Sequence, residues 1–263
     1  MGVLNVTPDS FSDGGQFLKA ADALAHANSM LQEGADIIEV GGESSRPGSG
    51  GISPEEELAR ILPVVESLVQ EGVCVAIDSR HLEVVHACLD KGAAIINDIT
   101  GFTDVAMQDL AAQSKAGCVV MHMQGSPQTM QDKPSYDRVV EEVGEFLLTQ
   151  AQLLVRRGVD NKRICLDPGP GFGKNYEQNL ALLQNTATLA SLSSDLDSQP
   201  YLLMAAWSRK SFLGEISGEE TPSKRVAASV FAAVYATERG AGVLRVHDVA
   251  PTVQALKVLE ALR

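Results

Sequence analysis

One arrangement recurs eight times along this chain: a short apolar run that ends in polar residues, then a loop, then a segment with helical periodicity. The run Tyr201–Trp207 is the clearest case, because it is entirely apolar and is followed directly by SRKS at 208–211. Short apolar runs that alternate with helices are typical of parallel strands buried on both faces. The recurrence therefore predicts an α/β fold built on a parallel sheet.

The predicted strands and helices account for most of the chain. The strands cover residues 2–6, 36–40, 73–78, 93–97, 118–123, 163–167, 201–207 and 243–246. The helices cover residues 17–33, 53–70, 81–91, 104–115, 136–157, 176–192, 221–238 and 249–262. Eight such units favour a closed TIM (β/α)₈ barrel, typically about 250 residues long, over an open doubly wound sheet, which stays the alternative. No low-complexity linker interrupts them, so we expect one domain over residues 1–263.

The composition narrows the class of protein. The net charge of −13 disfavours a nucleic-acid-binding surface. No apolar run reaches the roughly 18 residues that a membrane span needs, and the N-terminal residues do not resemble a secretory signal. The four cysteines, at 74, 88, 118 and 165, are far apart and lack metal-binding spacing. We therefore expect free thiols and a cytoplasmic protein.

Polar side chains end several of the predicted strands. Asp78, Asn97 and Asp167 each follow a buried apolar run, and the carboxyl ends of barrel strands meet at one mouth. Carboxylates accept hydrogen bonds and an amide both donates and accepts, so the three suit a flat heterocycle with several N–H groups. Each aspartate alone could equally be a helix N-cap. Three such groups at neighbouring strand ends are not all explained by capping.

A second group of strand-end residues is cationic. It comprises Arg46, Arg209, Lys210, Arg245 and His247, with Lys174 nearby. Arg245 and His247 are separated by one residue, so in a strand their side chains point to the same face. Because a guanidinium can bind a phosphate group through two hydrogen bonds, this group predicts an anionic, phosphorylated ligand.

Seven motifs, taken in this order, resemble those of dihydropteroate synthase, and the resemblance covers essentially the whole chain. They are GVLNVTPDSFSDGG (2–15), GGESSRPG (41–48), NDI (97–99), MHMQGSPQTM (121–130), DPGPGFGK (167–174), SRKSFLG (208–214) and RVHDV (245–249). The resemblance implies a transferase of folate biosynthesis on a TIM barrel. Such an enzyme joins 6-hydroxymethyl-7,8-dihydropterin pyrophosphate to p-aminobenzoate, which gives 7,8-dihydropteroate and pyrophosphate.

The resemblance also implies a role for individual positions. The pterin-binding residues would be Asp78, Asn97, Met121, Asp167 and Lys210, of which Asp78, Asp167 and Lys210 would be catalytic. The pyrophosphate would be held by Asn5, Ser45, Arg46, Arg245 and His247, with Asn5 as a ligand of Mg²⁺. The p-aminobenzoate pocket, where sulfonamide inhibitors would also bind, would be formed by Phe11, Pro47, Phe172 and Ser211. Loops 6–16 and 43–53 would close over the substrates.

The same resemblance suggests a mechanism and an assembly. Pyrophosphate would depart with the help of Mg²⁺ and leave a carbenium-like pterin, which the arylamine attacks. A homodimer would form through the late helices. The segment VAASVFAAVY (226–235) is apolar all round its predicted helix, which is consistent with burial on two sides, although core packing explains it nearly as well.

The chain departs from the pattern of the family at several positions. Serine replaces the usual threonine at 45 and 79, Glu39 replaces an aspartate, and Pro170 replaces an apolar residue. Ala206 and Trp207 stand where a glycine and a smaller apolar residue are usual, so we expect the Cβ of Ala206 to crowd the edge of the pterin. These changes bear on substrate affinity and sulfonamide sensitivity.

Two other functions remain open on the sequence alone. A methyltetrahydrofolate-dependent methyltransferase shares the aspartate and asparagine cradle but does not need the SRKS and RVH motifs found here. A non-catalytic paralogue that binds pterin without turnover is suggested by the departures at 39, 170, 206 and 207. The charged and amide residues named above are all present, which argues against that paralogue.

Overall fold

The computed structural model describes residues 1–7, 16–43, 51–194 and 199–263. Its eight strands are β1 (Gly2–Asn5), β2 (Ile38–Gly41), β3 (Val75–Asp78), β4 (Ile95–Asp98), β5 (Gly117–Met121), β6 (Ile164–Asp167), β7 (Leu202–Ala205) and β8 (Val243–Leu244). All neighbours are parallel and follow the order of the sequence. Val246 closes the ring, because its amide donates to Met1 and its carbonyl accepts from Val3. The closed barrel is confirmed, and the open sheet is excluded.

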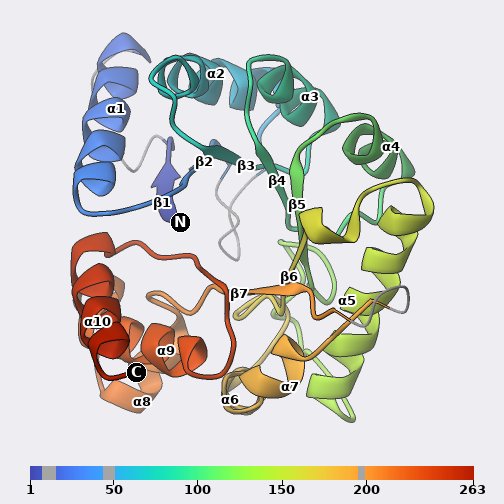
Figure 1. The fold of residues 1–263 in the computed structure, drawn as a ribbon, viewed down its shortest axis with the longest axis vertical. Coiled ribbons are helices and arrows are strands. Elements are labelled where there is room, and N and C mark those ends of the chain that lie inside the picture. Colours follow the sequence, from blue (N-terminus) through green and yellow to red (C-terminus); the bar gives the residue numbers. More distant parts are fainter. Residues whose placement is uncertain (8–15, 44–50, 195–198) are drawn as a thin grey trace.

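Ten α-helices within the described residues surround the strands (Figure 1). They are α1 (Gln16–Gln32), α2 (Pro54–Gln70), α3 (Leu82–Asp90), α4 (Val105–Gln113), α5 (Val139–Arg156), α6 (Tyr176–Gln184), α7 (Thr186–Ala190), α8 (Ser211–Ser217), α9 (Val226–Thr237) and α10 (Val249–Ala261). Helix α2 shows how the sequence sets a boundary. Ser53 caps its N-terminus by accepting from the Glu56 amide at 3.2 Å, and Pro54 occupies the first turn. No helix in these ranges is both long and apolar enough to cross a bilayer.

Three predicted boundaries were wrong. The helix expected over 176–192 is two helices, since Asn185 leaves helical geometry (ψ 25°) and its side chain donates to the Ala181 carbonyl. Helix α8, expected as loop, forms because Phe212 buries its ring against Trp207. The helix expected from 221 begins at Val226, where the buried Arg225 guanidinium donates to the carbonyls of Glu219 and Glu220 and shapes the preceding turn.

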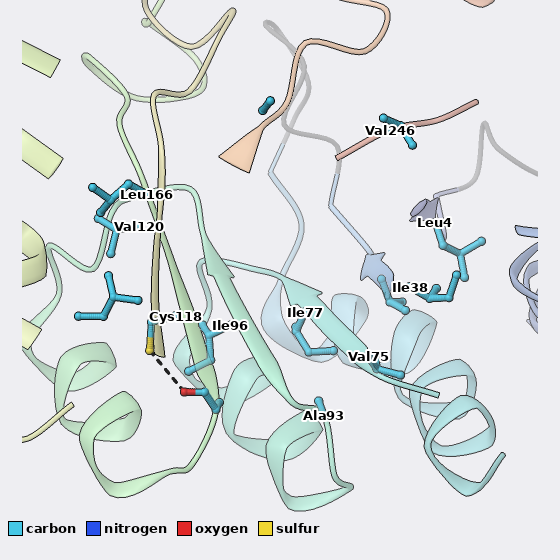
Figure 2. Close-up of a cluster of buried hydrophobic side chains, with 14 of the residues drawn as sticks. Leu4, Ile38, Val75, Ile77, Ala93, Ile96, Cys118, Val120, Leu166 and Val246 are labelled. Carbon is cyan, nitrogen blue, oxygen red and sulfur yellow. Dashed lines mark hydrogen bonds between the residues drawn. The ribbon is translucent and has the colours of Figure 1, made fainter. Parts of the chain in front are cut away.

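Alternation along the strands divides the core into two layers. Outward-facing residues such as Ile77, Ile96 and Val120 pack beneath the helices (Figure 2). Inward-facing residues near the amino ends of the strands form a separate apolar cluster of Val119, Cys165 and Met204. The upper half of the barrel interior is instead lined by polar side chains. All four cysteines, which lie in the described ranges, are free thiols, as expected.

Candidate active site

A small pocket lies where the carboxyl ends of the strands meet. Strands β3 to β6 and the loops after β4, β6, β7 and β8 contribute to it. Its lining residues are Asp78, Asn97, Ile99, Met121, Asp167, Pro170, Phe172, Ala206, Lys210 and Arg245. All five residues predicted to bind pterin are among them. Positions that are distant in the sequence therefore meet at one mouth, as expected for a barrel.

Part of the pocket lining is apolar. Ile99, Met121 and Phe172 belong to one small buried cluster, and Phe172 is only 7% exposed. The Lys210 ammonium lies 4.6 Å from the centre of the Phe172 ring, in a cation–π arrangement. Gly171 permits this approach, because a Cβ at that position would lie 3.3 Å from the Lys210 side chain. The pocket thus offers flat apolar surfaces beside a positive charge.

The polar base of the pocket is formed by Asp78, Asn97, Asp167 and Arg245, which we call the pocket floor. Arg245 donates from Nη2 to Asp78 Oδ2 at 2.8 Å and from Nε to Glu39 Oε2 at 2.6 Å. Asn97 donates from Nδ2 to Glu39 Oε1 at 2.6 Å. The other end of this amide, Oδ1, is buried and has no hydrogen-bond partner among the described residues. Such an oxygen is costly to bury alone, so it marks a place for a donor from a ligand.

The two aspartates of the pocket floor differ in their local bonding. Asp167 accepts from the Gly169 amide at 2.8 Å, so it partly fulfils the capping role that any strand-end aspartate could have. In the described part of the chain, Asp78 accepts only from Arg245. Asp98, the next strand-end aspartate, is bound within its own loop, since it accepts from the amides of Thr100 and Phe102. Asp78 and Asp167 therefore keep lone pairs for a ligand.

Burial shifts the ionisation of these groups. Burial, followed by the charge of Glu39, raises the pKa of Asp78 to about 7, although Arg245 opposes the shift. Burial also raises the pKa of Asp167, against the hydrogen bond from Gly169. Burial and then Arg245 lower the pKa of Lys210 to about 8. A ligand that donates to the aspartates and accepts from Lys210 would stabilise the charged forms.

The residues predicted to hold pyrophosphate are only partly visible. Asn5 ends β1 and is half-buried, whereas Ser45 and Arg46 lie outside the described residues. Arg245 faces the barrel interior. His247 lies beside β7, with Nδ1 3.0 Å from Ser208 Oγ, and burial followed by Arg245 lowers its pKa to about 3.

The p-aminobenzoate positions divide in the same way. Phe172 lines the pocket, and Ser211 is the exposed first residue of α8, directly after Lys210. Phe11 and Pro47 lie outside the described residues. The apolar wall of this subsite that can be placed is therefore Phe172.

The residues that depart from the pattern of the family lie in different surroundings. Ala206 and Pro170 line the pocket, as expected for residues that alter its packing. Trp207 does not, because it is buried against Phe212 with ring centroids 5.7 Å apart. Ser79 also points away from the pocket and donates to Glu57 at 2.9 Å. Glu39 lies beneath the pocket floor and is 1% exposed.

A second buried group, the Lys174 cluster, comprises Lys174, His122, Gly169 and Phe172; the sequence placed Lys174 near the predicted anion-binding cations, but its ammonium is bound by backbone carbonyls. Lys174 Nζ donates to the carbonyls of His122, Gly169 and Phe172 at 2.9–3.2 Å and lies 2.9 Å from His122 Nδ1. Gly169 has φ +64°, and a Cβ there would lie 1.9 Å from the His122 carbonyl oxygen. The cluster joins the loops after β5 and β6. Its only sequence signal was the placement of Lys174 beside a glycine-rich loop.

Another buried network lies at the base of α2. Glu57 is fully buried and accepts from Ser79, while His81 Nδ1 lies 2.7 Å from the same carboxylate oxygen. In the sequence, the pattern of these residues is the same as that of an ordinary solvent-exposed helix N-terminus. The network therefore could not be predicted from spacing.

The donor set bears on whether Mg²⁺ fits this site. Within the described residues, no group of three His, Cys, Asp or Glu side chains could enclose a metal ion. Mg²⁺ often keeps several waters and is held by one or two protein oxygens together with substrate phosphates. The amide oxygen of Asn5 is compatible with this second kind of site.

Comparison with known proteins agrees with the geometry. Residues 1–247 match the family described as pterin binding enzyme. A dihydropteroate synthase of Escherichia coli (strain K12) is 43% identical over 262 residues, which span 99% of this chain and 90% of that protein. The structure of Burkholderia cenocepacia dihydropteroate synthase complexed with 7,8-dihydropteroate is 45% identical, with a TM-score of 0.91 over 100% of this chain and 90% of that one.

A third similar protein is a solved structure with a bound drug. The Yersinia pestis dihydropteroate synthase structure with a sulfonamide drug complex is 40% identical, with a TM-score of 0.90 over 100% of this chain and 93% of that one. Sequence identity at this level over the full chain, together with the pocket, favours dihydropteroate synthase over the methyltransferase alternative. The chain belongs to the dihydropteroate synthases, transferases of folate biosynthesis within the pterin-binding enzyme family.

Proposed function

We propose that this chain condenses 6-hydroxymethyl-7,8-dihydropterin pyrophosphate with p-aminobenzoate to give 7,8-dihydropteroate and pyrophosphate. The observation that carries the proposal is Oδ1 of Asn97, which has no hydrogen-bond partner among the described residues and lies in the pocket with two carboxylates. A pterin ring carries several N–H donors along one edge. Asn97, Asp78 and Asp167 supply acceptors for that edge, and Lys210 supplies a donor for a ring nitrogen or carbonyl.

The apolar walls fix the plane of the ring. Met121 and Phe172 line the pocket beside the pocket floor. Dispersion contacts with these side chains would hold the bicycle flat, while the polar residues fix its rotation within the plane. The CH₂ group would then project toward the mouth, where the cationic residues lie.

The pocket supports a substitution at that CH₂ group. The C–O bond to pyrophosphate breaks, a C–N bond forms to the amine of p-aminobenzoate, and that amine loses one proton. Positive charge develops on the pterin as pyrophosphate leaves. Ionised Asp78 and Asp167 would stabilise this charge because they are already fixed in a buried site. Exclusion of water would keep it from competing with the amine.

The cationic residues would bind the leaving group. Arg245, His247 and Asn5 would hold the pyrophosphate, together with Ser45 and Arg46 of the sequence motif. Mg²⁺, when bound by pyrophosphate oxygens and Asn5, would neutralise charge that accumulates on the leaving group. The chain's own contribution is to hold the phosphates by hydrogen bonds from guanidinium groups.

p-Aminobenzoate and sulfonamides would share one subsite. The sulfonamide in the Yersinia pestis relative supports this proposal. Here the subsite would be bounded by Phe172 and Ser211, with Phe11 and Pro47 of the sequence motifs. Pro170 and Ala206 line the adjacent pocket, so we expect them to change the affinity for sulfonamides relative to family members without them.

We also propose a cytoplasmic homodimer. Phe231 of α9 is 69% exposed, Val258 of α10 is 61% exposed, and Leu262, directly after α10, is 79% exposed. The two helices lie side by side (Figure 1), and a second copy would cover these exposed apolar side chains. Sedimentation equilibrium should show a dimer that Phe231→Glu converts to a monomer. A wild-type monomer at micromolar concentration would contradict the assembly.

The proposed reaction is tested by pyrophosphate release from pterin pyrophosphate and Mg²⁺, with and without p-aminobenzoate. We expect release that depends on the amine, with dihydropteroate formed in equal amount. Tight pterin binding without release under either condition would instead identify a pterin-binding paralogue.

A further inference from the structure

Glu39 is a buried carboxylate beneath the pocket and has no role in the scheme above. It lies in the middle of β2 and faces the barrel interior with 1% of its surface exposed. Its register partner on β3 is Ala76, a small and fully buried residue. Because Ala76 leaves space in the barrel interior, Glu39 can extend past β3 to reach β4.

Both oxygens of Glu39 hold residues of the pocket floor. Oε1 accepts from Asn97 Nδ2 and Oε2 accepts from Arg245 Nε, each at 2.6 Å. Asn97 belongs to β4 and Arg245 follows β8, so one side chain joins opposite sides of the barrel. Short hydrogen bonds to a carboxylate are charge-assisted and strongly directional.

The contact with Asn97 determines which end of its amide faces the ligand. A carboxylate can only accept, so the NH₂ end of Asn97 must point down toward Glu39. The oxygen end must therefore point into the pocket, where it has no partner within the described residues. With the opposite orientation, two oxygens would face each other in a buried site.

The contact with Arg245 determines the position of the only guanidinium that lines the pocket in the described structure. The same guanidinium donates to Asp78 Oδ2 at 2.8 Å. Glu39 therefore places Arg245 against Asp78, and its own charge acts on Asp78 as well. The groups that act on Asp78 are Glu39, Arg245, Glu57, Asp98 and Lys210.

We propose that Glu39 is a positioning residue that presents the Asn97 oxygen to the pterin edge and fixes Arg245 against Asp78. This inference rests on the proposed function, since it names how the pterin site is oriented. The family resemblance places an aspartate here, and an aspartate is one methylene shorter. We therefore expect an aspartate at this position to hold Asn97 and Arg245 less closely than Glu39 does.

The test is the affinity of the protein for 6-hydroxymethylpterin, measured by fluorescence titration from pH 5 to 9, so it does not require turnover. In Glu39→Gln the side chain keeps its size but can accept from only one partner. We expect affinity at pH 8 to fall by about tenfold to a hundredfold, the range for a lost hydrogen bond to a charged group. Glu39→Asp should fall between this variant and wild type.

The pH profile separates positioning from loss of structure. Protonation of Asp78 removes an acceptor, so wild-type affinity should decline as pH falls through about 7. Without the charge of Glu39, the pKa of Asp78 is lower, and the decline in Glu39→Gln should shift to lower pH. A general loss of structure would lower affinity at every pH without moving the midpoint.

Glu66→Gln is the control, because Glu66 is a carboxylate of α2 that pairs with Lys91 at 2.7 Å and does not act on Asp78. It should leave stability near wild type and pterin affinity within about twofold, since an exposed pair contributes little. A double-mutant cycle with Asn97→Ala is the second test. Glu39→Gln should reduce pterin affinity clearly less in the Asn97→Ala background than it does in wild type.

An unchanged affinity and midpoint in Glu39→Gln would overturn the proposal, as would full additivity with Asn97→Ala. Pterin binding without pyrophosphate release would reject only the proposed reaction and would still test Glu39. If wild type does not bind pterin, both inferences fail.

Discussion

The pocket floor and the Lys174 cluster are both buried and charged, but only one of them has complete hydrogen bonding. The Lys174 ammonium has three carbonyl oxygens and a ring nitrogen within 3.2 Å. Burial, then Lys174, lowers the pKa of His122 to about 3, so the neutral ring can accept from the lysine. On the pocket floor, Asn97 Oδ1 has no partner within the described chain, and Asp78 has only Arg245.

The difference separates residues that hold the fold from residues that wait for a ligand. A buried group whose hydrogen bonds are complete stabilises its surroundings when it is present and leaves orphaned partners when it is removed. A group whose hydrogen bonds are incomplete already costs stability, and a ligand relieves that cost. Substitutions in the pocket floor should therefore affect activity more than stability, and those in the Lys174 cluster the reverse.

The largest effect should come from Lys210→Met, because Lys210 lines the pocket and its charge acts together with Asp78 and Asp167 of the pocket floor. This change removes the cation that lies over Phe172 but keeps most of the side-chain length. We expect turnover to fall by about a hundredfold or more, as when one preorganised donor is lost. The free energy of unfolding should stay within about 2 kcal/mol of wild type, because the cost of burying the ammonium disappears together with its attraction to Asp167. Pyrophosphate release and urea unfolding measure the two quantities.

If Lys210→Met lowered the free energy of unfolding by well over 2 kcal/mol, and turnover fell only as far as that unfolding explains, Lys210 would belong with the residues that hold the fold. The control is Lys91→Met, which removes a half-exposed lysine paired with Glu66 at 2.7 Å. An exposed pair contributes little, so both stability and turnover should stay near wild type.

Lys174→Met should have the opposite signature. It leaves three buried carbonyl oxygens without their donor, so we expect a loss of about 3 kcal/mol in unfolding free energy, the scale for orphaned buried groups. Turnover measured well below the unfolding transition should fall less than tenfold. The measurement is urea unfolding of both lysine variants under one set of conditions. A change in stability of under about 1 kcal/mol would show that the cluster does not hold the two loops together.

How much of this could be read from the sequence depends on whether a feature is local. The eight strands were predictable because each apolar run ends in polar residues, and the closed ring then places Asp78, Asn97 and Asp167 at one mouth. The break in the predicted helix at Asn185 was not predictable, because the helical period of apolar residues continues across it. Helix α8 was missed because burial of Phe212 against Trp207 is a tertiary contact.

Pairings across the barrel were beyond sequence reasoning for a different reason. The bonds of Glu39 to Asn97 and Arg245 depend on rotamers and on the small size of Ala76, which no spacing reveals. The outward direction of Trp207 was predictable in principle. Neighbouring strand residues face opposite sides, so if Ala206 lines the pocket, Trp207 does not.

The two regions should also respond to pH with opposite sign. Burial raises the pKa of Asp78 from 3.8 to about 7, so the folded state binds more protons between these values. Its contribution to stability therefore falls as pH rises across that window. Burial lowers the pKa of Lys174 from 10.5 to about 7, so the unfolded state binds more protons above pH 7. Its contribution should rise as pH increases toward 10.

Urea unfolding at a series of pH values tests this against Asp78→Asn and Lys174→Met. Wild type should lose stability relative to Asp78→Asn between about pH 4 and 7, and gain stability relative to Lys174→Met above about pH 7. Parallel curves for either variant would show that the group does not change its ionisation on folding.

The smallest effects should come from the neighbouring residues 206 and 207. Trp207→Phe removes part of a buried ring, and also a ring N–H that has no partner in the described structure. The two changes oppose each other, so we expect a loss of only about 1 kcal/mol in unfolding free energy. The KM for pterin pyrophosphate should stay within about twofold, because the ring faces α8 and not the ligand.

Ala206→Gly should do the reverse, with an altered KM and little loss of stability. If Trp207→Phe moved the KM more than Ala206→Gly, then α8 would transmit packing changes to the pocket. The separation between residues that hold the fold and residues that bind would then fail at this strand end.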